Sequence, residues 1–78
     1  SMDQVYDQLA DRFKLPSHFG RNLDALWDVL STDLEGPFEI VWTHAGESKK
    51  VLGRNYTRIM KLFLRLEKQR DDFRFKLE

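Results

Sequence analysis

The stretch HFGRNLDALWD, residues His18 to Asp28, decides how this 78-residue chain is built. Asn22 is a good N-cap for a helix, because its side-chain oxygen can accept a hydrogen bond from a backbone N–H of the first turn. Apolar residues then recur at helical spacing, so the sequence predicts a helix from Asn22 to about Thr32. The segment from His18 to Gly20, just before it, is predicted to be a turn.

This helix is predicted to have an acidic face and an apolar face. At about 100° per residue, Asp24, Asp28 and Ser31 lie together, and Trp27 lies at the boundary of the acidic face. Like charges at this spacing destabilise a helix by about 0.2–0.5 kcal/mol. The helix dipole favours Asp24 in the first turn, but Asp28 lies beyond its reach. The apolar face consists of Leu23, Ala25, Leu26, Val29 and Leu30.

Two interpretations of the acidic face are open. In one, the aspartates belong to an ordinary solvated helix face and Trp27 packs into the core. In the other, Asp24 and Asp28 anchor a cationic partner, since carboxylates accept charge-assisted hydrogen bonds from basic side chains and an aromatic ring adds contact area. Residues 22–47 include six acidic residues and no lysine or arginine. Because helix stability does not account for Asp28, the second interpretation is favoured.

The rest of the chain is predicted to alternate between helices and strands. Apolar spacing predicts a first helix over Asp3–Lys14, capped by Asp3 and ended by Pro16. Ser1 resembles a cloning remnant, so no role in the fold is expected for it. A strand, a short helix, a long amphipathic helix and a second strand are predicted at Phe38–Trp42, Glu47–Leu52, Asn55–Lys68 and Phe73–Leu77.

This order of elements favours an α/β fold. A strand–helix–strand unit of this length predicts parallel pairing. We expect a small parallel sheet of two to three strands packed against about four helices, in a single domain over residues 2–78. The chain has no cysteine, no apolar run of membrane-spanning length and no leader. We therefore expect a cytoplasmic protein without disulfides.

The run LPSHFGRNLDALWD, residues 15–28, resembles the signature of the barstar family, the intracellular inhibitors of barnase-type microbial ribonucleases. The resemblance implies a barstar-like fold, here without the family's N-terminal strand. It also implies a bacterial ribonuclease inhibitor or immunity protein that is not an enzyme, with a barnase-like ribonuclease or related toxin domain as partner. Further matches to the family pattern occur at Leu30, Pro37, Trp42, Ser48 and Phe63.

The resemblance also implies roles for single residues. Asp28 matches the acidic residue that takes the place of a substrate phosphate in the active-site cleft of the enzyme. Asp24 matches a carboxylate that pairs with an arginine of the enzyme, and Trp42 matches a buried tryptophan of the core. His18 and Arg65 depart from the family pattern. The expected partner-binding residues are His18, Gly20, Asn22, Asp24, Trp27, Asp28 and Ser31.

No metal, cofactor or catalytic residue is expected. The two histidines, His18 and His44, do not stand at ligand spacing with a carboxylate. Asp24 and Asp28 are predicted to lie on an outward helix face, whereas a catalytic pair needs a pocket.

The basic C-terminal part of the chain offers an alternative function. Residues 48–78 include ten basic and four acidic residues. One charged face of the long helix is either an ordinary solvated face or a surface that contacts nucleic-acid phosphates. No known nucleic-acid signature accompanies it, so nucleic-acid binding remains the alternative to inhibition. This basic face consists of Arg54, Arg58, Lys61, Arg65 and Lys68.

A sheet with so few strands has unpaired edges, and such edges can pair with another chain. We expect either that the two strands pair directly in a small sheet or that two copies join through their sheet edges as a homodimer. The dimer would add burial that a short chain has difficulty supplying alone.

Overall fold

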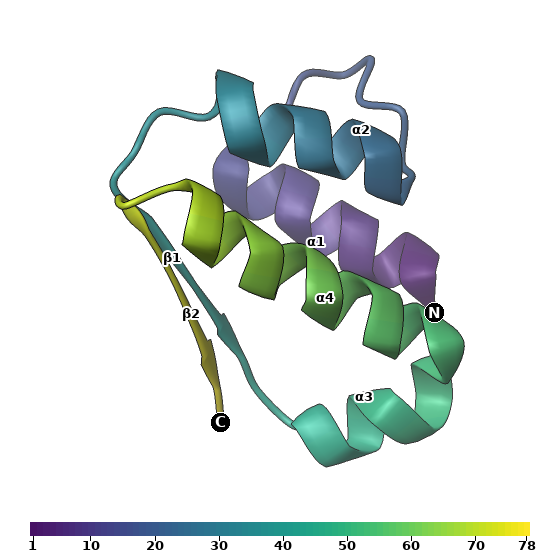
Figure 1. Ribbon diagram of the computed structural model, residues 1–78. Helices are drawn as coiled ribbons and strands as arrows, with labels where there is room; N and C mark the ends of the chain where they lie inside the picture. The colour runs from purple at the N-terminus through teal and green to yellow at the C-terminus, as the bar shows by residue number, and fades with distance from the viewer. The chain divides into compact units, whose positions relative to one another are not determined.

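The computed structural model describes all 78 residues. The chain forms two compact units, residues 1–34 and residues 35–78. Helices and a small parallel sheet make up the predicted α/β fold, whereas the expectation of a single domain stays a prediction. The elements, labelled in Figure 1, are α1 (Met2–Phe13), α2 (Leu23–Asp28), the π-helix η1 (Val29–Asp33), β1 (Phe38–Trp42), α3 (Ala45–Leu52), α4 (Arg54–Gln69) and β2 (Phe73–Leu77).

The first helix, α1, begins one residue earlier than predicted. Its N-cap is Ser1, whose hydroxyl accepts a hydrogen bond from the N–H of Gln4, while the Gln4 side chain accepts one from the amino group of Ser1. This reciprocal pair is a capping box. The prediction that Asp3 caps the helix is therefore wrong, and Ser1 takes that position instead. The helix ends where Lys14 takes a left-handed φ of 53°.

The second predicted helix changes type along its length. It starts directly after its N-cap Asn22, as predicted. After Asp28 it continues as the π-helix η1, in which the N–H of Leu34 donates to the carbonyl of Val29, five residues back, at 2.8 Å. The predicted span is helical throughout, but the assumption of 100° per residue fails after Asp28.

The two strands pair in parallel over the predicted residues, and Figure 1 shows them side by side. Phe38 lies opposite Phe73, and Ile40 lies opposite Phe75. Because side chains alternate between the two faces of a sheet, these four residues share one face, and Phe73 is fully buried there. The alternating pattern places Leu77 on the same buried face, but its side chain is 53% exposed.

Two helices connect the strands within the second unit. α3 starts two residues before the predicted position, where His44 with a left-handed φ of 57° turns the chain, and it ends at Gly53 as predicted. α4 extends one residue further at each end than predicted. Its buried residues repeat at helical spacing, as expected of an amphipathic helix, whereas Tyr56 near its start is only partly buried. The buried residues of α4 are Ile59, Met60, Leu62, Phe63 and Leu66.

Aromatic rings join α4 to the sheet. The ring of Phe63 lies 4.9 Å from that of Phe75 and 6.1 Å from that of Trp42, measured between centroids. The family resemblance implied a buried tryptophan at Trp42, and the structure leaves this side chain partly buried. Its indole Nε1 donates to the hydroxyl of Ser48 at 3.1 Å. A tryptophan at the edge of a core commonly keeps such a polar partner for its N–H group.

Candidate functional site

The acidic face of α2 is exposed, as the sequence predicts. The side chains of Asp24 and Asp28 are exposed, whereas Leu26 and Leu30 are fully buried. None of the ion pairs within the chain involves either aspartate. Both carboxylates can therefore accept charge-assisted hydrogen bonds from a cationic partner.

Trp27 and Ser31 border this acidic face, and both are partly exposed. The predicted boundary position of Trp27 is confirmed. Ser31 belongs to η1, so the wider π-helical turn sets its direction relative to Asp28. In the same turn, the hydroxyl of Thr32 donates to the backbone carbonyl of Asp28. This bond ties η1 to the end of α2.

One side chain shapes the turn in front of α2. The Oδ1 of Asn22 accepts from the N–H of Ala25 at 2.8 Å, and its Nδ2 donates to the carbonyl of Gly20 at 3.1 Å. A Cβ atom at Gly20 would lie 3.2 Å from the Cβ of Ala25. Glycine therefore allows the turn to close against the first turn of the helix. Gly20 and Asn22 are thus brought to the N-terminal end of the acidic face.

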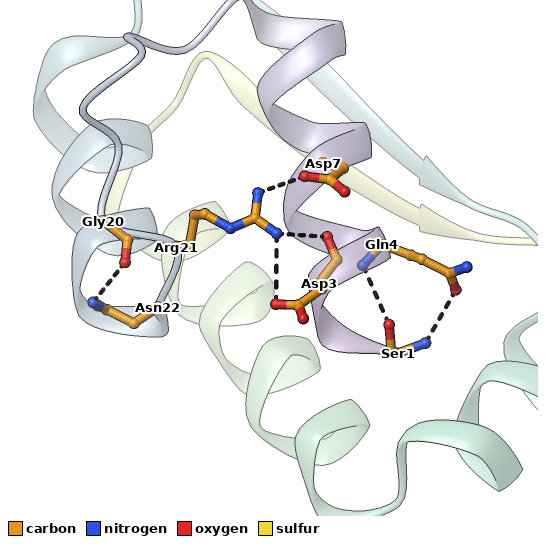
Figure 2. A network of polar contacts seen from close by, with 7 residues as sticks. All are labelled: Ser1, Asp3, Gln4, Asp7, Gly20, Arg21 and Asn22. Carbon is orange, nitrogen blue, oxygen red and sulfur yellow. Dashed lines mark hydrogen bonds and ion pairs between the residues drawn. The ribbon is translucent and has the colours of Figure 1, made fainter.

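Arg21 lies between these two residues and was not singled out from the sequence. Its guanidinium donates to the carboxylate of Asp7, to the backbone carbonyl of Asp3 at 3.2 Å and to the Asp3 carboxylate at 3.5 Å (Figure 2). The hydrogen bond to Asp7 is the main cause that raises the pKa of Arg21 above its usual value. Asp3 and Asp7 stand one turn apart on α1 with no basic residue three or four positions away. That pattern was the available signal for a cationic partner elsewhere in the chain.

An aromatic contact attaches the same segment to α1. The rings of Phe19 and Tyr6 meet edge to face, with centroids 6.0 Å apart and an interplanar angle of 70°. Burial of Tyr6 raises the pKa of its hydroxyl. The N–H of Phe19 donates to the carbonyl of Pro16 at 2.9 Å and closes the turn. The segment before α2 is therefore attached to α1 at one apolar point and one ionic point.

His18 is exposed in this turn, next to Phe19. No group of three or more histidine, cysteine or acidic side chains is arranged to hold a metal ion. No helix of the structure is long and apolar enough to cross a membrane.

His18 precedes Gly20 and Asn22 in the turn before α2 and therefore lies at the edge of the candidate surface that these two residues begin.

The basic face of α4 belongs to the second unit. It is exposed along its whole length, as the alternative function requires, and consists of Arg54, Arg58, Lys61, Arg65 and Lys68.

Comparison with known proteins identifies the family of the chain. A family model described as Barstar (barnase inhibitor) matches residues 1–78. The chain is also similar to a Bacillus subtilis (strain 168) protein named "Putative ribonuclease inhibitor YrdF". The two are 28% identical over 79 aligned positions, which cover 100% of this chain and 87% of the relative. With a match over its full length and the α/β fold described above, this chain belongs to the barstar family.

Proposed function

We propose that this protein inhibits a microbial ribonuclease by covering the active-site cleft of the enzyme with the acidic face of α2. The observation that carries this proposal is the exposure of Asp24 and Asp28 without any ion pair inside the chain. Membership of the barstar family supports a ribonuclease as the class of partner. The protein acts by binding and does not itself catalyse a reaction.

The chemistry of inhibition is mimicry of a phosphate. An enzyme that holds RNA presents cationic groups to the phosphodiester backbone. Carboxylates accept the same charge-assisted hydrogen bonds from those groups. On the family pattern, Asp28 takes the place of the substrate phosphate, and Asp24 pairs with an arginine of the enzyme. Trp27 adds apolar contact area at the border of the two carboxylates.

The remaining contact residues surround this pair. His18, Gly20 and Asn22 come from the turn in front of α2, and Ser31 comes from η1. The backbone of Gly20 allows close approach of the partner. Asn22 acts chiefly by fixing the start of α2 through its two hydrogen bonds.

The biological setting is an immunity function in the bacterial cytoplasm, where the inhibitor silences a ribonuclease or toxin domain. The absence of cysteine fits a reducing compartment. The similarity to a Bacillus subtilis protein supports a bacterial source.

The sheet supports a second, independent proposal about assembly. β1 and β2 pair directly, which is the first of the two arrangements expected from the sequence, and this pairing leaves each strand with one unpaired edge. An unpaired edge presents backbone N–H and C=O groups that another strand can satisfy. We therefore propose a homodimer formed through these edges.

Titration of barnase with the protein tests inhibition directly. RNA hydrolysis should fall to an end point at equimolar inhibitor. The matched control is the double variant Asp24→Asn/Asp28→Asn, which keeps the size of both side chains. In its presence, barnase should hydrolyse RNA at the rate seen without any inhibitor. A gel-shift assay with RNA covers the alternative function. Retardation of RNA without inhibition, lost on replacing Arg58 and Lys61 by glutamine, would instead assign binding to the basic face of α4.

A further inference from the structure

Arg21 places a positively charged residue within the segment proposed to contact the partner. Arg21 separates Gly20 from Asn22, and it precedes Asp24 by three residues. A cationic enzyme cleft that attracts Asp24 and Asp28 would be repelled by an arginine presented at the same place. The path of the Arg21 side chain resolves this conflict of sign, because the guanidinium reaches the carboxylates of α1 (Figure 2).

We propose that Arg21 is a positioning residue of the inhibitory surface, which holds the turn in front of α2 against α1 and keeps its own charge withdrawn from Asp24 and Asp28. This inference rests on the proposed function, since it concerns how the same acidic surface is prepared for its partner.

The backbone of the turn needs such an attachment. Arg21 has a φ of 52°, in the left-handed region that residues with a side chain seldom adopt. Local preference therefore opposes the turn, and tertiary contacts must hold it. The contacts available are the ion pairs of Arg21 with Asp3 and Asp7 and the ring contact of Phe19. They lie on either side of Gly20, so they fix its backbone from both directions.

The attachment extends to the helix through the next residue. Asn22 follows Arg21 directly, and its side chain bonds both the Gly20 carbonyl and the N–H of Ala25. A shift of the backbone at Arg21 would move Asn22 and weaken the cap of α2. The aspartates that contact the partner are thus presented by a turn and helix end that are already in place before binding.

The same attachment has an electrostatic consequence. If Asp7 were neutral, Arg21 would lose its main ionic partner and keep only the longer bonds to Asp3, so its guanidinium would be held less firmly away from the acidic face. A free cation there would compensate Asp24 and repel the cationic groups of the enzyme. Releasing Arg21 should therefore harm binding more than removing it. A purely structural contact would not produce this order, because both changes break the same ion pair.

The chain offers a matched control on α1. Asp11 is exposed one turn beyond Asp7 and takes part in none of the ion pairs. Asp7→Asn and Asp11→Asn make the same change in charge on the same helix, but only the first breaks the ion pair between Asp7 and Arg21. We expect Asp7→Asn to weaken binding to barnase about fivefold, as for the loss of one hydrogen bond that orients the site. Asp11→Asn alters only the long-range electrostatic attraction, which salt screens, and should change the affinity for barnase by about twofold or less.

The double variant Asp7→Asn/Arg21→Ala separates positioning from charge. With the released cation removed, binding should recover part of the loss seen in Asp7→Asn, which is a non-additive result. Affinity that is no better in the double variant than in Asp7→Asn would overturn the claim that the charge of Arg21 must be withdrawn.

Hydrogen exchange at the amides of Ala25 and Leu26 gives a readout without any partner, since both donate to Asn22. Asp7→Asn should speed exchange at both amides, and Asp11→Asn should not. Equal exchange in the two variants would overturn the positioning role, whether or not barnase is bound. If wild-type protein fails to bind barnase, that result counts against the proposed function, while the exchange comparison still decides whether Arg21 holds the turn.

Discussion

The guanidinium of Arg70 holds the carboxylate of Asp72 at two points, Nε to Oδ1 at 2.8 Å and Nη2 to Oδ2 at 2.7 Å. This fork lies in the turn between α4 and β2. The carbonyl of Asp72 accepts from the N–H of Phe38 at 3.0 Å, and the Arg70 guanidinium lies over the Phe38 ring, 4.9 Å from its centroid. The pair therefore ties the end of α4 to the start of both strands.

The ion pair between Arg70 and Asp72 makes the free energy of unfolding depend on pH. The hydrogen bond from Arg70 lowers the pKa of Asp72. Because the folded pKa lies below the unfolded value of about 3.9, this carboxylate stabilises the fold above that pH, and the contribution is lost as pH falls through the folded value. We expect the gap in urea midpoint between wild type and Asp72→Asn to be largest near neutral pH and to close in acid. High salt should also narrow it, since the Asp72 side chain is 41% exposed. A gap that stays constant with pH would contradict this.

Replacing Asp28 with alanine should damage partner binding most, and Asp24→Ala should come next. Each variant removes an acceptor of a charge-assisted hydrogen bond, and such a bond contributes about 1.5–3 kcal/mol. Titration calorimetry with barnase measures the loss. Asp33→Ala is the control, because Asp33 is an exposed aspartate outside the proposed contact set. Folding should be unaffected, since both site aspartates lie on the exposed face. A loss for Asp33→Ala as large as for Asp28→Ala would show that only net charge matters.

Association with a basic enzyme should be fast and sensitive to salt. The acidic residues between positions 22 and 47 attract a cationic cleft over a distance that ions screen to about 8–10 Å at ordinary ionic strength. Stopped-flow association rates should fall steeply as salt is raised, while dissociation rates change little. Association rates that stay flat across the series would argue against electrostatic attraction by this surface.

Removal of the helix cap should cost stability as well as binding. Asn22→Ala deletes the acceptor for the Ala25 N–H, and loss of an N-cap typically lowers the free energy of unfolding by about 1 kcal/mol. Asn22→Ser keeps an acceptor oxygen and serves as the matched control. Urea unfolding followed by circular dichroism compares the two. Equal unfolding free energies for both variants would mean that the cap contributes nothing measurable.

The proposed dimer has a direct hydrodynamic test. Sedimentation velocity at micromolar concentration should show a species of twice the 9.3 kDa chain mass. The thermal midpoint should rise with protein concentration, because association favours the folded chains. A single 9.3 kDa species with a midpoint independent of concentration would rule the dimer out.

Local patterns predicted the elements well where one periodicity dominates. FEIVW and FRFKL give β1 and β2 to the residue, because branched and aromatic side chains suit an extended backbone. The first residues of the helices are harder to predict, since each depends on a single backbone conformation or a single side-chain hydrogen bond. The capping box of Ser1 and the left-handed His44 are two such events.

In the candidate site too, features set by local sequence could be predicted, whereas those set by distant residues could not. The exposed aspartates of α2 follow from the phase of the helix, which is a local property. The role of Arg21 does not, because its partners Asp3 and Asp7 lie 18 and 14 residues away. The π-helical turn also cannot be predicted from a helical wheel. Nothing in VLSTD alone favours a backbone hydrogen bond to the residue five positions back over one to the residue four positions back.

That wide turn gives the helix a place where its length can change. A π-helical turn holds one residue more than the α-helical turn it replaces. Deleting one residue within η1 would let an ordinary turn form. The two aspartates of the acidic face, Asp24 and Asp28, lie before that point. Single-residue insertions and deletions in related chains should therefore collect at Val29–Asp33, where Asp24 and Asp28 keep their spacing and only Ser31 of the proposed contact residues shifts.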